Sequence, residues 1–143
     1  VLPGMVKMTG DARALSKETN EKIASKMLQI VEGICNAHGV NGSVKYETTC
    51  PVTFNSKNQT ESATKAAVSL LGSDKCNGDI EPRLFSEDFS VMANEKPGCF
   101  VLMGNGKSDQ HSRPLHADNY DFNDELLVIG SSYWTELVEQ QLK

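Results

Sequence analysis

A histidine-bearing stretch near the C-terminus, Arg113–Asp124, contains residue types that could do chemistry. His116 lies there between a proline and acidic residues, on a predicted loop that precedes an amphipathic helix. Neutral imidazole is the most common protein metal ligand and the usual acid/base group, and loops held between ordered elements commonly carry both roles. A surface or hydrogen-bonded histidine has the same local sequence, so His116 alone is a candidate and no more.

The other candidate ligands have simpler interpretations. His38 falls in the last turn of a predicted helix, where a cation is favoured, and His111 lies in a polar loop that favours solvent exposure. Glu87 and Asp88 could bind a metal, although acidic residues at a helix start more often interact with the helix dipole. A catalytic zinc needs about three protein ligands, and HExxH, GxSxG and Walker sequences are absent from the chain. From the residues alone, we therefore expect this chain to supply only part of a metal or catalytic site.

Composition limits the classes of partner. The 143 residues carry a formal net charge of −5 without a lysine- and arginine-rich stripe, which argues against a nucleic-acid partner. No apolar run approaches the roughly 18 residues of a membrane span. The four cysteines are scattered, a pattern that favours free thiols in a reducing, cytoplasmic compartment. The start at Val1, without a signal-peptide pattern, suggests a piece of a longer protein.

The first third of the chain has the pattern of a strand, a helix and a second strand. Residues 5–15 alternate between polar and apolar types, which predicts a strand. Ser16 is the expected N-cap of a helix that Gly39 ends. Residues 43–49 then predict another strand. This order predicts half of a ferredoxin-like sheet-and-helix layer, with the other half upstream.

The remainder of the chain predicts an α/β arrangement. A helix is expected over residues 59–71, and a short helix capped by Ser86 opens within 85–89. The apolar run 99–103 is typical of a buried strand, and Asn123 is expected to cap the last helix. Because irregular sequence separates the two parts, we place a boundary after residue 52, giving domains 1–52 and 53–143.

Several ordered motifs make the sequence resemble a known family over essentially its whole length. The most specific are the Ser-Glu-Asp-Phe segment and the Leu-His segment that is followed by Tyr-Asp-Phe-Asn-Asp. The motifs are Val1–Gly4, Gly10–Arg13, Phe85–Phe89, Pro97–Gly98, Leu102–Gly106, Pro114–His116 and Tyr120–Glu125. Together they resemble the C-terminal portion of a dinuclear-metal amidohydrolase of the aminoacylase and hippurate hydrolase metallopeptidase family.

The resemblance implies an architecture and an activity for the whole protein. Residues 1–52 would be the second half of an α/β lid domain that mediates dimerisation, and residues 53–143 the C-terminal part of an α/β zinc-peptidase-like catalytic domain. The enzyme would cleave the amide bond of N-acyl amino acids such as hippurate with a metal-bridging water. It would use two divalent metal ions, most often zinc, with manganese, cobalt or nickel as alternatives. This chain alone is expected to be inactive.

The resemblance also assigns residue roles. His116 would be the metal ligand contributed by the last part of the catalytic domain. Arg13 would bind the substrate carboxylate, and Ser86 and Glu87 would line the substrate pocket. The general base and the remaining ligands are expected upstream. The family's Asn-Pro pair after the ligand is replaced here by residues 117–119, which we expect to alter loop geometry more than ligation.

The expected partners are an N-acyl amino acid, the rest of the same polypeptide and a second copy bound through the lid domain. Neither nucleic acid nor a membrane is expected. The alternative is a non-catalytic α/β binding or dimerisation module that uses no metal.

Overall fold

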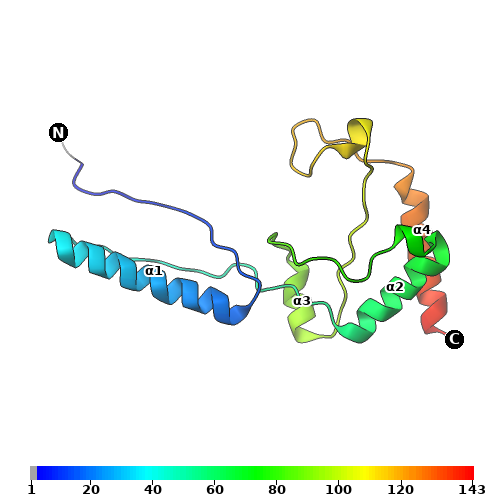
Figure 1. The fold of residues 1–143 in the computed structure, drawn as a ribbon, viewed down its shortest axis with the longest axis horizontal. Coiled ribbons are helices and arrows are strands. Elements are labelled where there is room, and N and C mark those ends of the chain that lie inside the picture. The colour runs from blue at the N-terminus through cyan, green and yellow to red at the C-terminus, as the bar shows by residue number, and fades with distance from the viewer. Residues whose placement is uncertain (1–2) are drawn as a thin grey trace. The chain divides into compact units, whose positions relative to one another are not determined.

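The computed structural model describes residues 3–143, apart from the side chain of Asp109, and divides them into two compact units. Unit 1 runs up to Thr53 and includes Glu81–Met92, whereas unit 2 contains Phe54–Ile80 and Ala93–Lys143. Four α-helices and two short 3₁₀ helices are found in the described residues (Figure 1). They are α1 (Lys17–His38), α2 (Lys57–Leu71), η1 (Ser73–Lys75), α3 (Phe89–Glu95), η2 (Asp109–Ser112) and α4 (Leu126–Gln141).

Helix α1 has the ends that its sequence predicts. The Thr19 backbone N–H donates to Ser16 Oγ at 3.1 Å, which satisfies one of the backbone donors that a helix start leaves unpaired. Gly39 adopts a left-handed φ of 66° at the other end, and the Val40 N–H donates to the Cys35 carbonyl at 3.0 Å. Glu18 lies in the first turn, and hydrogen bonds from its own backbone N–H and from Ser16 lower its pKa.

The chain after α1 runs back alongside this helix (Figure 1). The Tyr46 hydroxyl donates to Asn20 Oδ1, and Asn20 Nδ2 donates to Thr48 Oγ1 at 2.7 Å. Near the other end of the helix, a β-carbon added at Gly42 would lie 2.3 Å from the Cys35 sulfur. The glycine therefore allows the returning segment to lie directly against α1.

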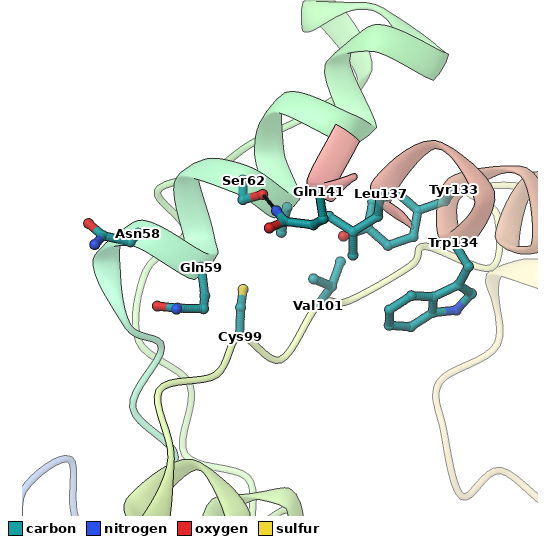
Figure 2. A pocket seen from close by; sticks show the side chains of 10 residues that line it. Asn58, Gln59, Ser62, Cys99, Val101, Tyr133, Trp134, Leu137 and Gln141 are labelled. Atoms are coloured by element: carbon teal, nitrogen blue, oxygen red, sulfur yellow. Dashed lines mark hydrogen bonds between the residues drawn. The ribbon is translucent and has the colours of Figure 1, made fainter. Parts of the chain in front are cut away.

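Helices α2 and α4 pack against each other and form the centre of unit 2. Ala63 and Ala66 of α2 are buried, as is Tyr133 of α4. Gln140 Nε2 also donates to the Ser62 hydroxyl at 3.1 Å. Small side chains permit this close approach. The predicted helix over 59–71 is confirmed, and the helix packs against α4 (Figure 2).

The predicted α/β fold is wrong for the described residues, because residues 3–143 contain no β-strand. This result corrects both the sheet-and-helix lid and the α/β arrangement expected for the catalytic part. A strand requires backbone hydrogen bonds to a neighbouring strand, and alternation of side chains does not supply them. Met5, Val6 and Met8 are 84%, 75% and 89% exposed, so the first expected strand has no packed face.

In the run 99–103, hydrogen bonds to a side chain replace the backbone hydrogen bonds of a sheet. The Phe100 N–H donates to Asn55 Oδ1 at 2.8 Å, and Asn55 Nδ2 donates to the Phe100 carbonyl at 2.9 Å. One asparagine side chain thus occupies the backbone groups that a neighbouring strand would use. Val101 and Leu102 remain 46% and 52% exposed, so the expected burial of this run is also wrong.

Two predicted helix caps differ from the structure. Helix α3 begins at Phe89, so Ser86 lies before it and does not cap a helix opening at 85–89. The Asn123 side chain accepts a hydrogen bond from the Glu125 N–H at 3.1 Å, but α4 begins only at Leu126. Asn123 therefore forms the turn that precedes the helix.

No helix in the described part of the chain combines the length and apolar character needed to cross a membrane. All four cysteines are unpaired and half-buried.

Candidate functional site

Arg13 is held in unit 1 by groups from two separate segments. Its Nε lies 2.8 Å from Asp11 Oδ2, while Nη1 donates to the Leu84 carbonyl and to Ser86 Oγ, both at 3.2 Å. These contacts use Nε and Nη1, and Nη2 makes no hydrogen bond within residues 3–143. The Arg13 side chain is still 45% exposed. The group is thus oriented and keeps donors for a further anion.

Ser86 joins Arg13, but Glu87 does not. The Glu87 backbone carbonyl accepts a hydrogen bond from the Ser90 N–H at 3.1 Å, just before α3. Its half-buried side chain makes no hydrogen bond or ion pair in the part of the chain that the structure describes. Of the three residues expected to contact substrate, the structure brings Arg13 and Ser86 together through a direct bond.

His116 lies in unit 2 on an exposed loop and has an unusual backbone conformation. Its φ is 69°, the only positive φ of a non-glycine residue in the described chain. His116 is the third residue of a turn in which the Ala117 N–H donates to the Pro114 carbonyl at 3.2 Å, and a second turn follows, in which the Tyr120 N–H donates to the Ala117 carbonyl at 3.1 Å. Its imidazole is exposed and makes no hydrogen bond within residues 3–143.

Asn105 fixes the two ends of this loop. Its Nδ2 donates to the carbonyls of His111 and Asp121 at 3.2 and 2.8 Å, and its Oδ1 accepts from the Asn123 N–H at 2.8 Å. The Asn123 side chain returns a bond to the Asn105 carbonyl at 3.3 Å. One side chain therefore ties together three segments around the His116 loop.

Two further contacts shape the same loop. Arg113 Nη1 donates to the Asn119 carbonyl across the turn that contains His116. Gly106 has a φ of 145°, and a β-carbon there would lie 2.9 Å from His111 Cβ, so only glycine allows this approach. His111 is half-buried, and its Nδ1 lies 3.4 Å from the Asp121 carbonyl, which corrects its expected exposure to solvent.

Sequence reasoning missed Asn105 and Arg113 as supports of the candidate ligand. A signal for Asn105 was available, because an asparagine between two glycines commonly marks a turn fixed by its side chain. The carbonyl partner of Arg113 had no such signal, since any residue supplies a backbone carbonyl.

The described residues do not assemble a complete metal site. No group of three His, Cys, Asp or Glu side chains gathers in residues 3–143 closely enough to hold a metal ion. His116 has the chemistry of a single ligand, because its exposed imidazole is not occupied by another group in the described chain.

Comparison with known proteins gives the family. The model of peptidase family M20/M25/M40 matches residues 4–140. The chain belongs to this family, and the sequence-based recognition is confirmed.

Curated relatives align with nearly all of the chain. It is 28% identical to a hippurate hydrolase of Campylobacter jejuni over 143 residues, covering 100% of this chain and 36% of that protein. An N-acetyldiaminopimelate deacetylase of Leuconostoc mesenteroides is 27% identical, with 99% of this chain and 36% of the relative covered. An IAA-amino acid hydrolase of Arabidopsis thaliana is also 27% identical, with 99% and 34% covered. The chain spans about a third of the length of these relatives. No solved structure matches.

Proposed function

We propose that this chain is part of a metal-dependent amidohydrolase that cleaves the amide bond of N-acyl amino acids. Membership of peptidase family M20/M25/M40, together with relatives named for the hydrolysis of hippurate and of IAA-amino acids, supports this proposal. Both kinds of substrate are amino acids acylated on nitrogen, and they share a free carboxylate. The chain by itself would be inactive, because it lacks a complete set of candidate ligands in its described residues.

The observation that carries the proposal is the orientation of Arg13. A guanidinium held at Nε by Asp11 and at Nη1 by the Leu84 carbonyl and Ser86 presents its remaining N–H groups in a fixed direction. Such a planar donor suits a carboxylate better than a flexible ammonium does. Arg13 would bind the substrate carboxylate, Ser86 would hold the guanidinium, and Glu87 would line the same pocket.

His116 would hold one of two divalent metal ions through a ring nitrogen. When bound, such ions, proposed here as zinc, polarise a carbonyl and lower the pKa of a water molecule. The contribution of this chain would be to keep the imidazole in place through Asn105, Arg113, the turn that contains His116 and the turn that follows it. Residues outside 1–143 would supply the other ligands and the general base.

We also propose that residues 1–52 belong to a lid domain, residues 53–143 to a catalytic domain, and that the complete protein is a cytoplasmic homodimer. The exposed apolar side chains of α1 support a dimer contact through the first part. Leu28, Ile30 and Ile34 are 44%, 58% and 56% exposed, and burying such a surface would be favourable.

Kinetics on matched substrates test the role of Arg13. In the natural-length protein, Arg13→Ala should lower kcat/KM for hippurate by roughly tenfold to hundredfold, because a charge-assisted hydrogen bond contributes about 1.5–3 kcal/mol. The amide of hippurate has no carboxylate, so the same variant should leave its kcat/KM unchanged.

Lys17→Ala is the matched control, because it removes an 82% exposed cation of the same unit. It should leave both rates unchanged. If Arg13→Ala lowers kcat/KM equally for hippurate and for its amide, Arg13 does not bind the substrate carboxylate. Absence of hydrolysis of either substrate by the wild-type protein would remove the proposed function.

A further inference from the structure

Three asparagines of the chain are directly followed by glycine: Asn41, Asn77 and Asn105. At such a pair the main chain can attack its own side chain, because glycine has no β-carbon to shield its amide nitrogen. The glycine nitrogen closes a succinimide ring on the asparagine Cγ, and the side-chain amide leaves as ammonia. The three pairs have the same chemistry, so the structure around each one decides which of them reacts.

Asn41 and Gly42 leave both reacting groups unoccupied. The two residues are exposed and lie in the extended connection that follows α1. Neither the side-chain amide of Asn41 nor the N–H of Gly42 makes a hydrogen bond within residues 3–143. The Asn41 side chain can therefore rotate its Cγ toward the Gly42 nitrogen, and water can reach the ring that forms.

Asn105 is the opposite case. Its Nδ2 donates to the carbonyls of His111 and Asp121, and its Oδ1 accepts from the Asn123 N–H. Attack by the Gly106 nitrogen would reorient this amide and break all three hydrogen bonds. Since each bond lowers the population of the reactive conformer severalfold, three of them lower it roughly hundredfold.

Asn77 is intermediate between these two. Its Oδ1 accepts a single hydrogen bond from the Asp79 N–H at 2.9 Å. This bond closes a local turn that holds the side chain next to its own backbone. Restraint of the side-chain amide therefore increases from Asn41 through Asn77 to Asn105.

We propose that Asn41 is a site of spontaneous deamidation and isoaspartate formation in the folded protein. A bond forms between the Gly42 nitrogen and Asn41 Cγ while the Cγ–Nδ2 bond breaks, and the departing nitrogen takes the Gly42 amide proton to become ammonia. Water then opens the succinimide. Addition at Cγ gives aspartate, whereas addition at the main-chain carbonyl gives isoaspartate. Water is the only co-reactant, and the proposal is independent of the proposed amide hydrolysis.

Isoaspartate at position 41 would disturb the contact between the returning segment and α1. The main chain would then run through the side-chain carbons and gain a methylene group. Gly42 cannot absorb this by moving toward the helix, because a β-carbon there would already lie 2.3 Å from Cys35 Sγ and 3.2 Å from Val31 Cγ1. The segment should instead move away from α1 and weaken the bond between Tyr46 and Asn20.

Peptide mapping of the natural-length protein, incubated at neutral pH and 37 °C, tests the proposal. Mass spectrometry gives the converted fraction at each pair, and enzymatic methylation with labelled S-adenosylmethionine identifies isoaspartate. Asn41 should convert roughly hundredfold faster than Asn105, with Asn77 between them, as the hydrogen bonds require. Faster conversion at Asn77 or Asn105 would overturn the proposal. An unconverted Asn41, under conditions in which a synthetic peptide of residues 38–46 converts, would do the same.

Incubation in urea separates the effect of the fold from that of the local sequence. Unfolding removes the hydrogen bonds of Asn77 and Asn105, so the three conversion rates should come together. If the difference between Asn41 and Asn105 persists in urea, local sequence causes it and the structural argument is wrong.

Two glutamine variants complete the test. Asn41→Gln keeps a side-chain amide, but its ring would be larger and close more slowly, so the variant should lose most of the isoaspartate label. Asn77→Gln is the matched control and should keep it; equal labelling of the two variants would overturn the assignment to Asn41. After incubation, hydrogen exchange over residues 42–48 should be faster in the wild-type protein and unchanged in Asn41→Gln. Unchanged exchange in isoaspartate-containing wild-type protein would overturn the proposed effect on α1.

Discussion

His116 has a backbone conformation that its side chain disfavours. At a φ of 69°, the β-carbon of an L-residue comes close to the carbonyl that follows, and the cost is about 1–2 kcal/mol. Such positions are concentrated at functional sites, where the surrounding structure holds them. Here the turn that contains His116, the turn that follows it and the Arg113 contact provide that support. The conformation projects the imidazole from the loop without a partner in the described chain.

This strain predicts opposite effects of glycine at two neighbouring positions. His116→Gly should be more stable to urea than His116→Ala by about 1 kcal/mol, because glycine adopts positive φ without the β-carbon contact. Leu115 is the matched control, since it is 72% exposed and lacks a positive φ. There the glycine variant should be the less stable of the two. Equal stability of both variants at position 116 would contradict the left-handed conformation.

At the scale of elements, the loop that carries His116 depends on side-chain bonds more than on regular structure. Between η2 and α4 it has no helix of its own, and Asn105 connects it to the segment before η2. The Asn105 amide hydrogen-bonds backbone groups at both ends of this loop. Within a helix, such groups are satisfied by other backbone groups.

Removal of this amide should therefore loosen the whole loop. Asn105→Ala should lower the free energy of unfolding by about 2 kcal/mol, from several hydrogen bonds contributing roughly 0.5–1.5 kcal/mol each. It should also increase hydrogen exchange at the Asn123 N–H. Asn77→Ala removes an asparagine with a single local bond to the Asp79 N–H and should cost about 0.5 kcal/mol. Similar losses for the two variants would show that Asn105 does not brace the loop.

Element prediction succeeded where local interactions decide the structure. Ser16 and Gly39 bound α1 because both caps act within a few residues. Strand prediction failed because a strand is completed by a distant neighbour. Residues 5–15, 43–49 and 99–103 have suitable side-chain patterns, but none of these segments forms a strand in the described chain. Ser86 was misplaced as a cap since its partner, Arg13, is 73 residues away in sequence.

At the scale of the whole molecule, the family was recognisable from the sequence, whereas the supports of its candidate site were not. Ordered motifs around Arg13, Ser86 and His116 carried the resemblance, and the match over residues 4–140 confirms it. Spacing in sequence does not report that the Leu84 carbonyl and Ser86 converge on Arg13, or that Asn105 reaches Asp121. The roles of these residues in catalysis are proposals about the complete protein.

Removal of metal from the complete protein tests the proposed role of His116 at this scale. A ligand that binds only the folded state stabilises it by about 4 kcal/mol at a thousandfold excess over its Kd. A chelator should therefore lower the Tm of the natural-length protein by several degrees and abolish hydrolysis, and added zinc should restore both.

His116→Ala should start from a lower metal content and show a smaller chelator-induced decrease in Tm. His111→Ala is the matched control, because its half-buried ring contacts the Asp121 carbonyl within the same loop. That variant should keep the full chelator response even if its starting Tm is lower, since it removes packing without removing a ligand. If the chelator leaves the Tm of the wild-type protein unchanged, the proposed metal site is wrong. A full response in His116→Ala would instead leave the metal in place and assign its ligand to another residue.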